Sequence, residues 1–181
     1  MATWICLLRA VNVGGRNKVP MAKLRDVLNA DGFADVRTYV QSGNVVLTSS
    51  LRSPSKVSDA VRTAIAREFE VDTPVVVRTP AELRAVVAWN PFPDVAAVAP
   101  QRVHIVHLTD IPSSNAVDAL LATDWEPEQI AFRATELAIC YSESMHTSKL
   151  QYAAVLKRLG VDGTARNWRT VETLADMSSS A

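Results

Sequence analysis

The sequence predicts an α+β protein in which one order of elements, strand–helix–strand–strand–helix–strand, occurs twice. Apolar residues make up 48% of the 181 residues and charged residues 21%, which is the composition of a globular chain that can bury a core. Strand patterns alternate with helical patterns in the same order before and after a proline-rich segment, 89–101. Similar segments, EVDTPVVV and GVDGTARN, follow the second predicted helix of each half. This order predicts two tandem ferredoxin-like (βαββαβ) units with extra helices.

Each element of the first half has a local signal. The continuous apolar run from Trp4 to Leu8 predicts a strand buried on both faces. Proline suits the first position of a helix and glycine the position after its end, so Pro20 and Gly32 bound the next element. In the hairpin that follows, Gly43 and Asn44 suit a turn with positive φ. The predicted elements are a strand at 4–8, a helix from 20, a hairpin at 34–49, a helix at 53–69 begun by Ser53 or Ser55, a strand at 73–78 and a helix at 80–89.

The second half repeats this order after a connector. Three prolines and no clear period mark 89–101 as that connector. Gly160 suits the end of a helix whose N-cap is Thr147 or Ser148. The predicted elements are a strand at 102–108, a helix at 113–122, a hairpin at 129–142, a helix at 148–159, a short strand at 161–167 and a helix at 168–177. The chain is therefore divided into a first unit at 1–88, the connector, a second unit at 102–177 and a flexible tail at 178–181.

The distribution of charge restricts the partners that we expect. The formal net charge is zero, whereas a general nucleic-acid binder usually carries a basic excess. Residues 1–25 nevertheless hold no acidic residue and five cationic ones, which are Arg9, Arg16, Lys18, Lys23 and Arg25. This segment can form a local positive face.

The cysteines and the apolar runs predict a soluble cytoplasmic protein. Cys6 and Cys140 lie in apolar runs far apart in the chain, which favours two reduced, buried thiols over a disulfide or a CxxC metal site. The run at 4–8 is too short for a signal sequence, and no run approaches the roughly 18 apolar residues of a membrane span. Because no cluster of His, Cys, Asp and Glu has the spacing of metal ligands, we expect no metal and no cofactor.

The loop Asn12–Lys18, between the first strand and the first helix, is a candidate anion site. Gly14 and Gly15 allow a close approach of the ligand to backbone N–H groups. The start of the following helix adds unpaired N–H groups, and Arg16 and Lys18 add full positive charges. The spacing is neither that of a Walker A loop nor G-x-G-x-x-G. The alternative is a glycine corner whose cationic side chains face water.

The hairpin turn QSGN, residues 41–44, is a second candidate. Gln41, Ser42 and Asn44 can bond a polar ligand beside the first loop, because both loops flank adjoining strands; alternatively, the segment is only a turn. It joins two strands and lacks the G-x-S-x-G pattern of a nucleophile elbow. His104 and His107 are three residues apart in a predicted strand, so their side chains point to opposite faces of the sheet. We expect one of these faces to be exposed to water. No Ser–His–acid triad is assembled from these residues.

The segment TARNW, residues 164–168, is a third candidate. Arg166 and Asn167 are rich in hydrogen-bond donors, and Trp168 offers either a stacking face or a core anchor. The step Arg-Asn also occurs in GRNK of the first loop, so the two segments can line one cleft if the halves pack with pseudo-symmetry. The alternative is that Asn167 caps the last helix and Trp168 docks it. Single-stranded nucleic acid would instead need exposed sheet aromatics, for which Tyr39 and Tyr141 are candidates.

The segments LLRAVNVGGRNKVPMAKL, VRTYVQSGNVVLTS and TARNW resemble a bacterial family known as domain of unknown function 1697. The family pattern is close to LLRGINVGG, then TYIQSGNVVF, and near the end S-K and TRNW. Here Ala10 replaces the usual Gly and adds a Cβ beside the loop, Val11 replaces Ile, and Ala165 replaces Thr. The resemblance implies a two-part α+β body of repeated ferredoxin-like units and implies no activity. The positions it marks are Arg9, Asn12, Gly14, Gly15, Gln41, Ser42, Gly43, Asn44, Ser148, Lys149, Arg166, Asn167 and Trp168.

These observations favour a module that binds an anionic or phosphate-bearing small ligand at Asn12–Lys18 and Gln41–Asn44, with Arg166–Asn167 closing the site. One alternative is an enzyme at the same site, with Ser42 and Lys149 as candidate catalytic groups. Another is a nucleic-acid or protein-interaction module, and a structural role is also open. The sequence fixes neither the ligand nor the oligomeric state. The full set of candidate ligand-binding residues is Arg9, Asn12, Gly14, Gly15, Arg16, Lys18, Gln41, Ser42, Gly43, Asn44, Lys149, Arg166, Asn167 and Trp168.

Overall fold

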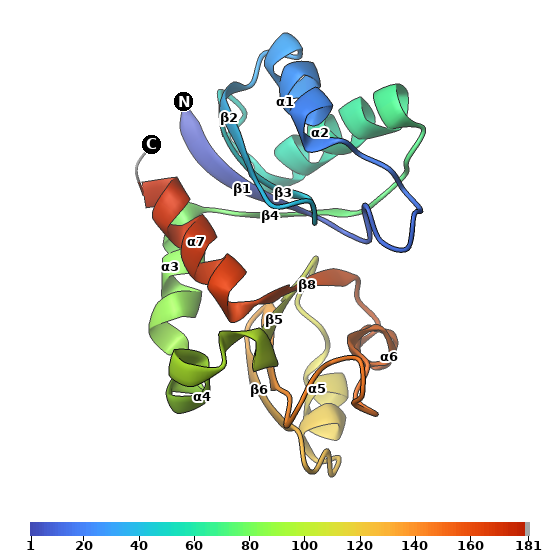
Figure 1. The fold of residues 1–181 in the computed structure, drawn as a ribbon, viewed down its shortest axis with the longest axis vertical. Helices are drawn as coiled ribbons and strands as arrows, with labels where there is room; N and C mark the ends of the chain where they lie inside the picture. The colour runs from blue at the N-terminus through green and yellow to red at the C-terminus, as the bar shows by residue number, and fades with distance from the viewer. Residues whose placement is uncertain (180–181) are drawn as a thin grey trace. The chain divides into compact units, whose positions relative to one another are not determined.

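The computed structural model describes residues 1–179. Within these residues there are two four-stranded antiparallel sheets and seven α-helices (Figure 1). The elements are β1 (Ala2–Leu8), α1 (Met21–Ala30), β2 (Ala34–Tyr39), β3 (Asn44–Ser49), α2 (Pro54–Phe69), β4 (Val75–Arg78), α3 (Pro80–Trp89), α4 (Pro93–Val98), a 3-10 turn η1 (Pro100–Arg102), β5 (Val103–Leu108), α5 (Ser114–Leu121), β6 (Gln129–Arg133), β7 (Glu136–Cys140), α6 (Tyr152–Leu159), β8 (Gly163–Asn167) and α7 (Trp168–Ser179).

The chain divides into two compact units. The first holds Met1–Ala85 and the chain from Thr173 onward, and the second holds Val86–Glu172. Both boundaries fall inside helices, α3 and α7, rather than in the connector that the sequence predicted. No helix among residues 1–179 is both long and apolar enough to cross a membrane.

The first sheet has the strand order β2-β3-β1-β4, and every neighbouring pair is antiparallel. Helices α1 and α2 cover one face (Figure 1). Alternate residues of β1, Trp4, Cys6 and Leu8, point into a core shared with the apolar stripes of both helices. This core fixes the ends of β1 and β3, from which the candidate loops extend.

The second sheet has the order β6-β7-β5-β8, again with antiparallel neighbours throughout. Its core lies on the face that carries Val106, Leu137 and Ile139, together with residues of α5 and α6. The strand order relative to chain order is therefore the same in both units.

The registers of the two sheets also correspond position by position. Leu7 pairs with Asn44 and Val76 in the first sheet, as His107 pairs with Glu136 and Thr164 in the second. Ile5 pairs with Arg78 in the first sheet, as Ile105 pairs with Arg166 in the second. Both arginines are buried, and each donates Nη1 to the carbonyl of the residue before it, over 3.0 Å from Arg78 and 2.8 Å from Arg166.

The helices that precede the last strands end in the same way. Glu70 after α2 and Gly160 after α6 both have left-handed backbone, with φ of 55° and 69°. Each donates its N–H to a carbonyl four residues earlier, and each is followed by the dipeptide Val-Asp. The similar sequences EVDTPVVV and GVDGTARN thus mark equivalent helix ends.

Several element boundaries differ from the sequence prediction. The connector contains α4 and η1, and Ser178 and Ser179 continue α7 instead of beginning a tail; residues 180–181 lie outside the described residues. Helix α6 begins at Tyr152, not at 148. The reason is local: the Ser148 hydroxyl accepts a bond from the N–H of Leu150, which closes a turn before the helix. Neither Thr147 nor Ser148 is therefore its N-cap.

Candidate functional site

The loop after β1 forms a small hairpin of its own. Val13 and Arg16 form an isolated bridge, with the Arg16 N–H donating to the Val13 carbonyl over 3.0 Å. Gly14 and Gly15 between them have φ of 57° and 75°. A two-residue turn with positive φ at both positions matches the right-handed twist of its flanks, and glycine adopts it without steric cost. The two glycines are therefore required by the turn.

Asn12 holds this hairpin in place with its side-chain amide. Nδ2 donates to the carbonyls of Val19, over 2.9 Å, and Gln41, over 2.8 Å. Oδ1 accepts from the N–H of Val19 over 2.8 Å. The loop 9–20 and the turn 41–44 thus lie side by side, and together they are called the loop pair here.

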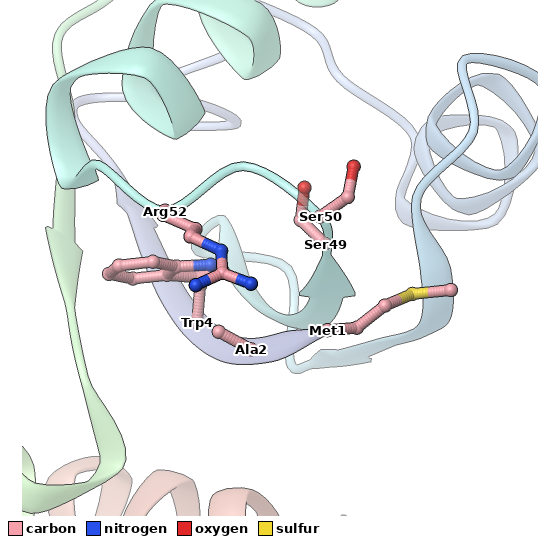
Figure 2. Close-up of a pocket in the computed structure, with 6 residues that line it drawn as sticks. All are labelled: Met1, Ala2, Trp4, Ser49, Ser50 and Arg52. Carbon is pink, nitrogen blue, oxygen red and sulfur yellow. The ribbon is translucent and has the colours of Figure 1, made fainter.

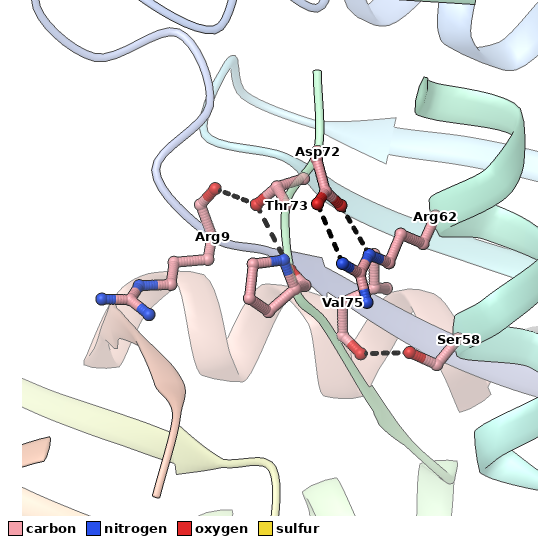
Figure 3. A network of polar contacts seen from close by, with 7 residues as sticks. Arg9, Ser58, Arg62, Asp72, Thr73 and Val75 are labelled. Atoms are coloured by element: carbon pink, nitrogen blue, oxygen red, sulfur yellow. Dashed lines mark hydrogen bonds and ion pairs between the residues drawn. The ribbon is translucent and has the colours of Figure 1, made fainter. Parts of the chain in front are cut away.

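The base of the loop pair is bonded to Thr73 and Pro74, directly before the strand β4. Figure 3 shows the Thr73 hydroxyl donating to the carbonyl of Arg9. The N–H of Arg9 in turn donates to the carbonyl of Pro74 over 3.1 Å. Beside them, Asp72 is engaged by Arg62 through bonds of 2.6 and 3.0 Å, and this hydrogen-bonded guanidinium lowers the pKa of the carboxyl.

Gly43 lets the two loops pack closely. Its backbone dihedral φ is 77°, and a Cβ there would lie 2.6 Å from Val11 Cγ2 and 2.7 Å from Leu8 Cβ. Its carbonyl accepts from the N–H of Leu8 over 2.8 Å. Of the two turn residues predicted to favour positive φ, Gly43 has it; Asn44 does not and begins β3, while Val40 has φ of 48°.

Residues with left-handed backbone are concentrated in the loop pair. They are Ala10, Asn12, Gly14, Gly15, Asn17 and Gly43, and Val40 directly precedes the turn 41–44. For a β-branched residue such as Val40 this conformation is strained, and strain of this kind gathers at ligand-binding and active sites. The position of Ala10, with φ of 50°, also explains the family preference for Gly. The cost of alanine there is backbone strain.

Arg16 and Lys18 carry the available charge of the loop pair. Both are exposed, and within residues 1–179 neither side chain has a hydrogen-bond or ion-pair partner. Lys23, by contrast, lies 2.5 Å from Glu68, and Arg25 donates to the Thr38 hydroxyl over 2.6 Å. The first turn of α1 contains no acidic residue, and its N-cap, Pro20, supplies no side-chain bond. The positive face predicted from residues 1–25 is thus reduced to the loop and the start of the helix.

The turn 41–44 contains one buried polar side chain that shapes the turn and one that is exposed to solvent. Asn44 is fully buried, and its Nδ2 donates to the Tyr39 carbonyl over 3.0 Å and to the Ser42 hydroxyl over 2.9 Å. Its amide therefore shapes the turn itself. Gln41 is exposed, and its carbonyl accepts the bond from Asn12.

The remaining candidate residues belong to the second unit. Arg166 is 6% exposed, and its Nη1 donates to the Thr164 hydroxyl over 2.7 Å. Burial lowers the pKa of this guanidinium to about 10. Asn167 Oδ1 accepts from the N–H of Thr170 and so caps α7, and Trp168 is buried. Lys149 is exposed in the turn-rich segment before α6. The capping and docking alternative for Asn167 and Trp168 is therefore the one observed.

Sequence reasoning missed a close buried contact between a histidine and a carboxylate in the second sheet. His107, expected on a partly wet strand, is fully buried, and its Nδ1 lies 2.6 Å from Oε2 of Glu136. Neither ring nitrogen of His107 makes a hydrogen bond within the described residues, so the two side chains are close without hydrogen-bond geometry. Its only sequence signal is that both residues lie in predicted strands; which polar strand residues are covered depends on tertiary packing.

The other side chains that could take part in binding or catalysis are structural or inaccessible. Tyr141 is fully buried, so it cannot be one of the exposed sheet aromatics suggested for nucleic acid. Cys6 and Cys140 are free and buried, as their apolar runs predicted, and burial raises the pKa of the Cys6 thiol to about 12. Within residues 1–179 no three His, Cys, Asp or Glu side chains are grouped to hold a metal ion.

The fold and loops define an α+β protein of two similar sheet-containing units with a strained, cationic loop pair on the first. A family model described as "Protein of unknown function (DUF1697)" matches residues 1–137, and the chain belongs to this family. The chain is also similar to the solved structure of a conserved bacterial protein from Streptococcus pneumoniae. The two share 23% identity over 99% of each chain, with a TM-score of 0.76, and so share the fold. No curated protein matches the chain.

Proposed function

We propose that the loop pair binds a small anionic ligand, most simply one that carries a phosphate group. The observation that carries this proposal is the state of Arg16 and Lys18: both are exposed and, within the described residues, have no carboxylate partner. They are held beside the uncapped start of α1, whose backbone N–H groups favour an anion.

The backbone of the loop pair supports the same function. The N–H groups of Gly14, Gly15 and Lys18 donate to no group of the described chain. The hairpin, Asn12 and Thr73 hold them in a fixed arrangement without using them. A preorganised set of N–H donors with two cations costs little reorganisation when a phosphate binds. Gln41 adds an exposed side-chain amide at the rim.

The ligand is tested with inorganic phosphate, pyrophosphate, AMP and glucose 6-phosphate as probes, by thermal shift and then calorimetry. A ligand present at about 100 times its Kd adds about 2.7 kcal/mol of stability, which is visible as a shift in Tm. The variant Arg16→Ala with Lys18→Ala should lose the shift. A control variant, Lys56→Ala with Lys157→Ala, removes the same charge from exposed sites elsewhere and should keep it. Binding that survives the loss of Arg16 and Lys18 would refute the proposal.

A ligand-binding role for Arg166, which lies in the second unit, stays a prediction. Its buried guanidinium donates to Thr164 and to the carbonyl of Ala165 within that unit.

We also infer that the two units are tandem ferredoxin-like units derived from one ancestral β-α-β-β-α-β unit. The matched strand orders, the equivalent pairings of Leu7 and His107, and the equivalent bonds of Arg78 and Arg166 support this inference. A helix also follows each last strand, capped by Thr79 with Glu82 in one case and by Asn167 in the other. Localisation in the cytoplasm remains a proposal.

A further inference from the structure

The first sheet carries a cavity at the end away from the loop pair. Ala2 pairs with Ser49 at this end, whereas Leu7 pairs with Asn44 at the end that carries the loop pair. The cavity has a volume of about 460 Å³ and is lined by Met1, Ala2, Trp4, Ser49, Ser50 and Arg52 (Figure 2). Sites for small molecules usually enclose about 300–1,000 Å³, so the cavity is large enough for one.

The aromatic and hydroxyl groups of the cavity are held firmly. Trp4 is 5% exposed, and its indole Nε1 donates to the Leu51 carbonyl over 3.2 Å. The N–H of Leu51 in turn donates to the Ser49 hydroxyl over 3.1 Å. Because this hydroxyl accepts a bond there, its own proton remains available to a ligand.

The charge in the cavity is positive and uncompensated. Arg52 is exposed and has no hydrogen-bond or ion-pair partner within residues 1–179, and no Asp or Glu lines the cavity. Figure 2 shows the Arg52 guanidinium and the Trp4 indole on one side, with Ser49 and Ser50 on the other. A guanidinium can bind an acid group through two parallel hydrogen bonds. The guanidinium and the indole can each also pack against a flat ring of the ligand.

A neighbouring cavity extends the space without adding free negative charge. It has a volume of about 450 Å³ and shares Ser49 and Ser50 with the first. Its one carboxylate, Asp31, accepts from Arg67 through two contacts of 3.0 Å. Phe33 and Ala64 give it an apolar wall.

We propose that the cavity at Trp4 and Arg52 binds a small aromatic anion, with the acid group on Arg52 and the ring beside Trp4. The Ser49 and Ser50 hydroxyls donate to the same acid group or to ring substituents. No residue of the loop pair lines the cavity, so this site is separate from the proposed phosphate site.

The test is an NMR titration of the nitrogen-15-labelled full chain with 1-naphthoate and with 1-naphthyl phosphate, which share a ring and differ in the acid group. The indole N–H resonance of Trp4 is assigned as the signal that is missing from the spectrum of the variant Trp4→Phe. We expect this resonance to shift saturably with at least one of the two anions. The neutral 1-naphthamide should bind at least about tenfold more weakly, because it lacks the charge-assisted bonds.

Two variants decide the assignment. Arg52→Gln should lower the affinity for the anion at least about tenfold at unchanged Tm, since the side chain is exposed. Lys157→Gln removes a charge from an exposed residue outside both proposed sites and should leave the affinity unchanged. No shift at Trp4, equal binding of 1-naphthamide, or full affinity in Arg52→Gln would each overturn the proposal, whatever the outcome at the loop pair. The better-binding acid group identifies the ligand as a carboxylate or a phosphate ester.

Discussion

Asn12 donates its side-chain amide to the backbone carbonyl of Gln41 over 2.8 Å, and this bond ties together two loops that are 29 residues apart in the chain. The same amide makes two bonds with Val19. Since each lost internal bond costs about 0.5–1.5 kcal/mol, we expect Asn12→Ala to lower the free energy of unfolding by about 2–3 kcal/mol. Urea unfolding measures this loss of stability. Asn17→Ala, which also changes a residue with positive φ but loses one side-chain bond, is the matched control and should cost about 1 kcal/mol.

Substitution of the glycines separates steric contact from backbone strain. Gly43→Ala places a Cβ against Val11 and Leu8 and keeps a positive φ, so it should destabilise the fold by about 2–4 kcal/mol. Gly14→Ala has the same kind of φ but nothing within 4 Å of the new Cβ, and should cost only about 1–2 kcal/mol. Thermal or urea unfolding of both variants gives the comparison. Equal costs would show that the close approach at Gly43 is unimportant.

Relief of strain in the loop pair and at Val40 beside it should stabilise the protein. Ala10 has φ of 50° and is exposed, so Ala10→Gly removes a left-handed alanine without removing a buried group. The relief of about 1–2 kcal/mol is partly offset by the greater entropy of glycine in the unfolded chain, which leaves a gain of about 0.5–1 kcal/mol. Val40→Asn, at φ of 48°, should give a similar gain, because asparagine tolerates this conformation. A lower Tm in both variants would contradict the strain argument.

The buried pair of His107 and Glu136 should show strong coupling. Removing one partner leaves the other polar side chain buried without its close contact, so His107→Leu or Glu136→Asn alone should cost about 1–3 kcal/mol. The double variant reproduces the pair Leu7 and Asn44, found at the equivalent position of the first sheet. We expect it to cost clearly less than the sum of the single variants. A double-mutant cycle by urea unfolding measures the coupling, and additive costs would exclude it.

The stability of the second unit should fall at acid pH through His104. Its ring packs edge-on against Tyr141 with centroids 5.2 Å apart, and its Nε2 faces the Gln101 carbonyl at 3.1 Å. Burial, and to a smaller extent His146, lower the pKa of His104 below its ordinary 6.5, although the Gln101 bond acts in the opposite direction. Below about pH 6.5 the unfolded chain therefore binds a proton that the folded protein does not, and stability falls as the pH falls toward the folded pKa.

His104→Phe keeps an aromatic ring against Tyr141 and removes the titration. Its free energy of unfolding should depend less on pH between 6.5 and 5 than that of the parent protein. Urea unfolding at several pH values within this window measures the difference in slope. Identical slopes in the two proteins would show that His104 does not contribute.

The order of the elements could be predicted because it depends on local patterns. The run at Trp4–Leu8 has the composition of a buried strand, Pro20 marks the start of α1 closely, and α3 has the predicted bounds of Pro80–Trp89. Boundaries were wrong at the start of α6, where a short-range side-chain bond decides it, and in the connector. The start of α6 is delayed by the turn at Ser148, and the connector contains short helices despite its three prolines.

The candidate site could be predicted only in part. The adjacency of the two loops follows from the strands they flank, and the glycines signal the turns. The sequence did not show that the side-chain amides of Asn12 and Asn44 form hydrogen bonds within the loops. It also did not show that Arg16 and Lys18 have no partner in the described chain. Burial of His107 with Glu136 and of Tyr141 depends on which strand residues are covered, and this is a tertiary property.

The hairpin of the first loop divides its positions into two kinds. Gly14, Gly15 and Asn12 set the course of the backbone, whereas Arg16 and Lys18 project from it without supporting it. Substitution of Arg16 or Lys18 should therefore leave the free energy of unfolding nearly unchanged. Under the proposed function, the side chains that contact the ligand can therefore be changed by engineering, or can diverge among relatives, while the shape of the loop persists.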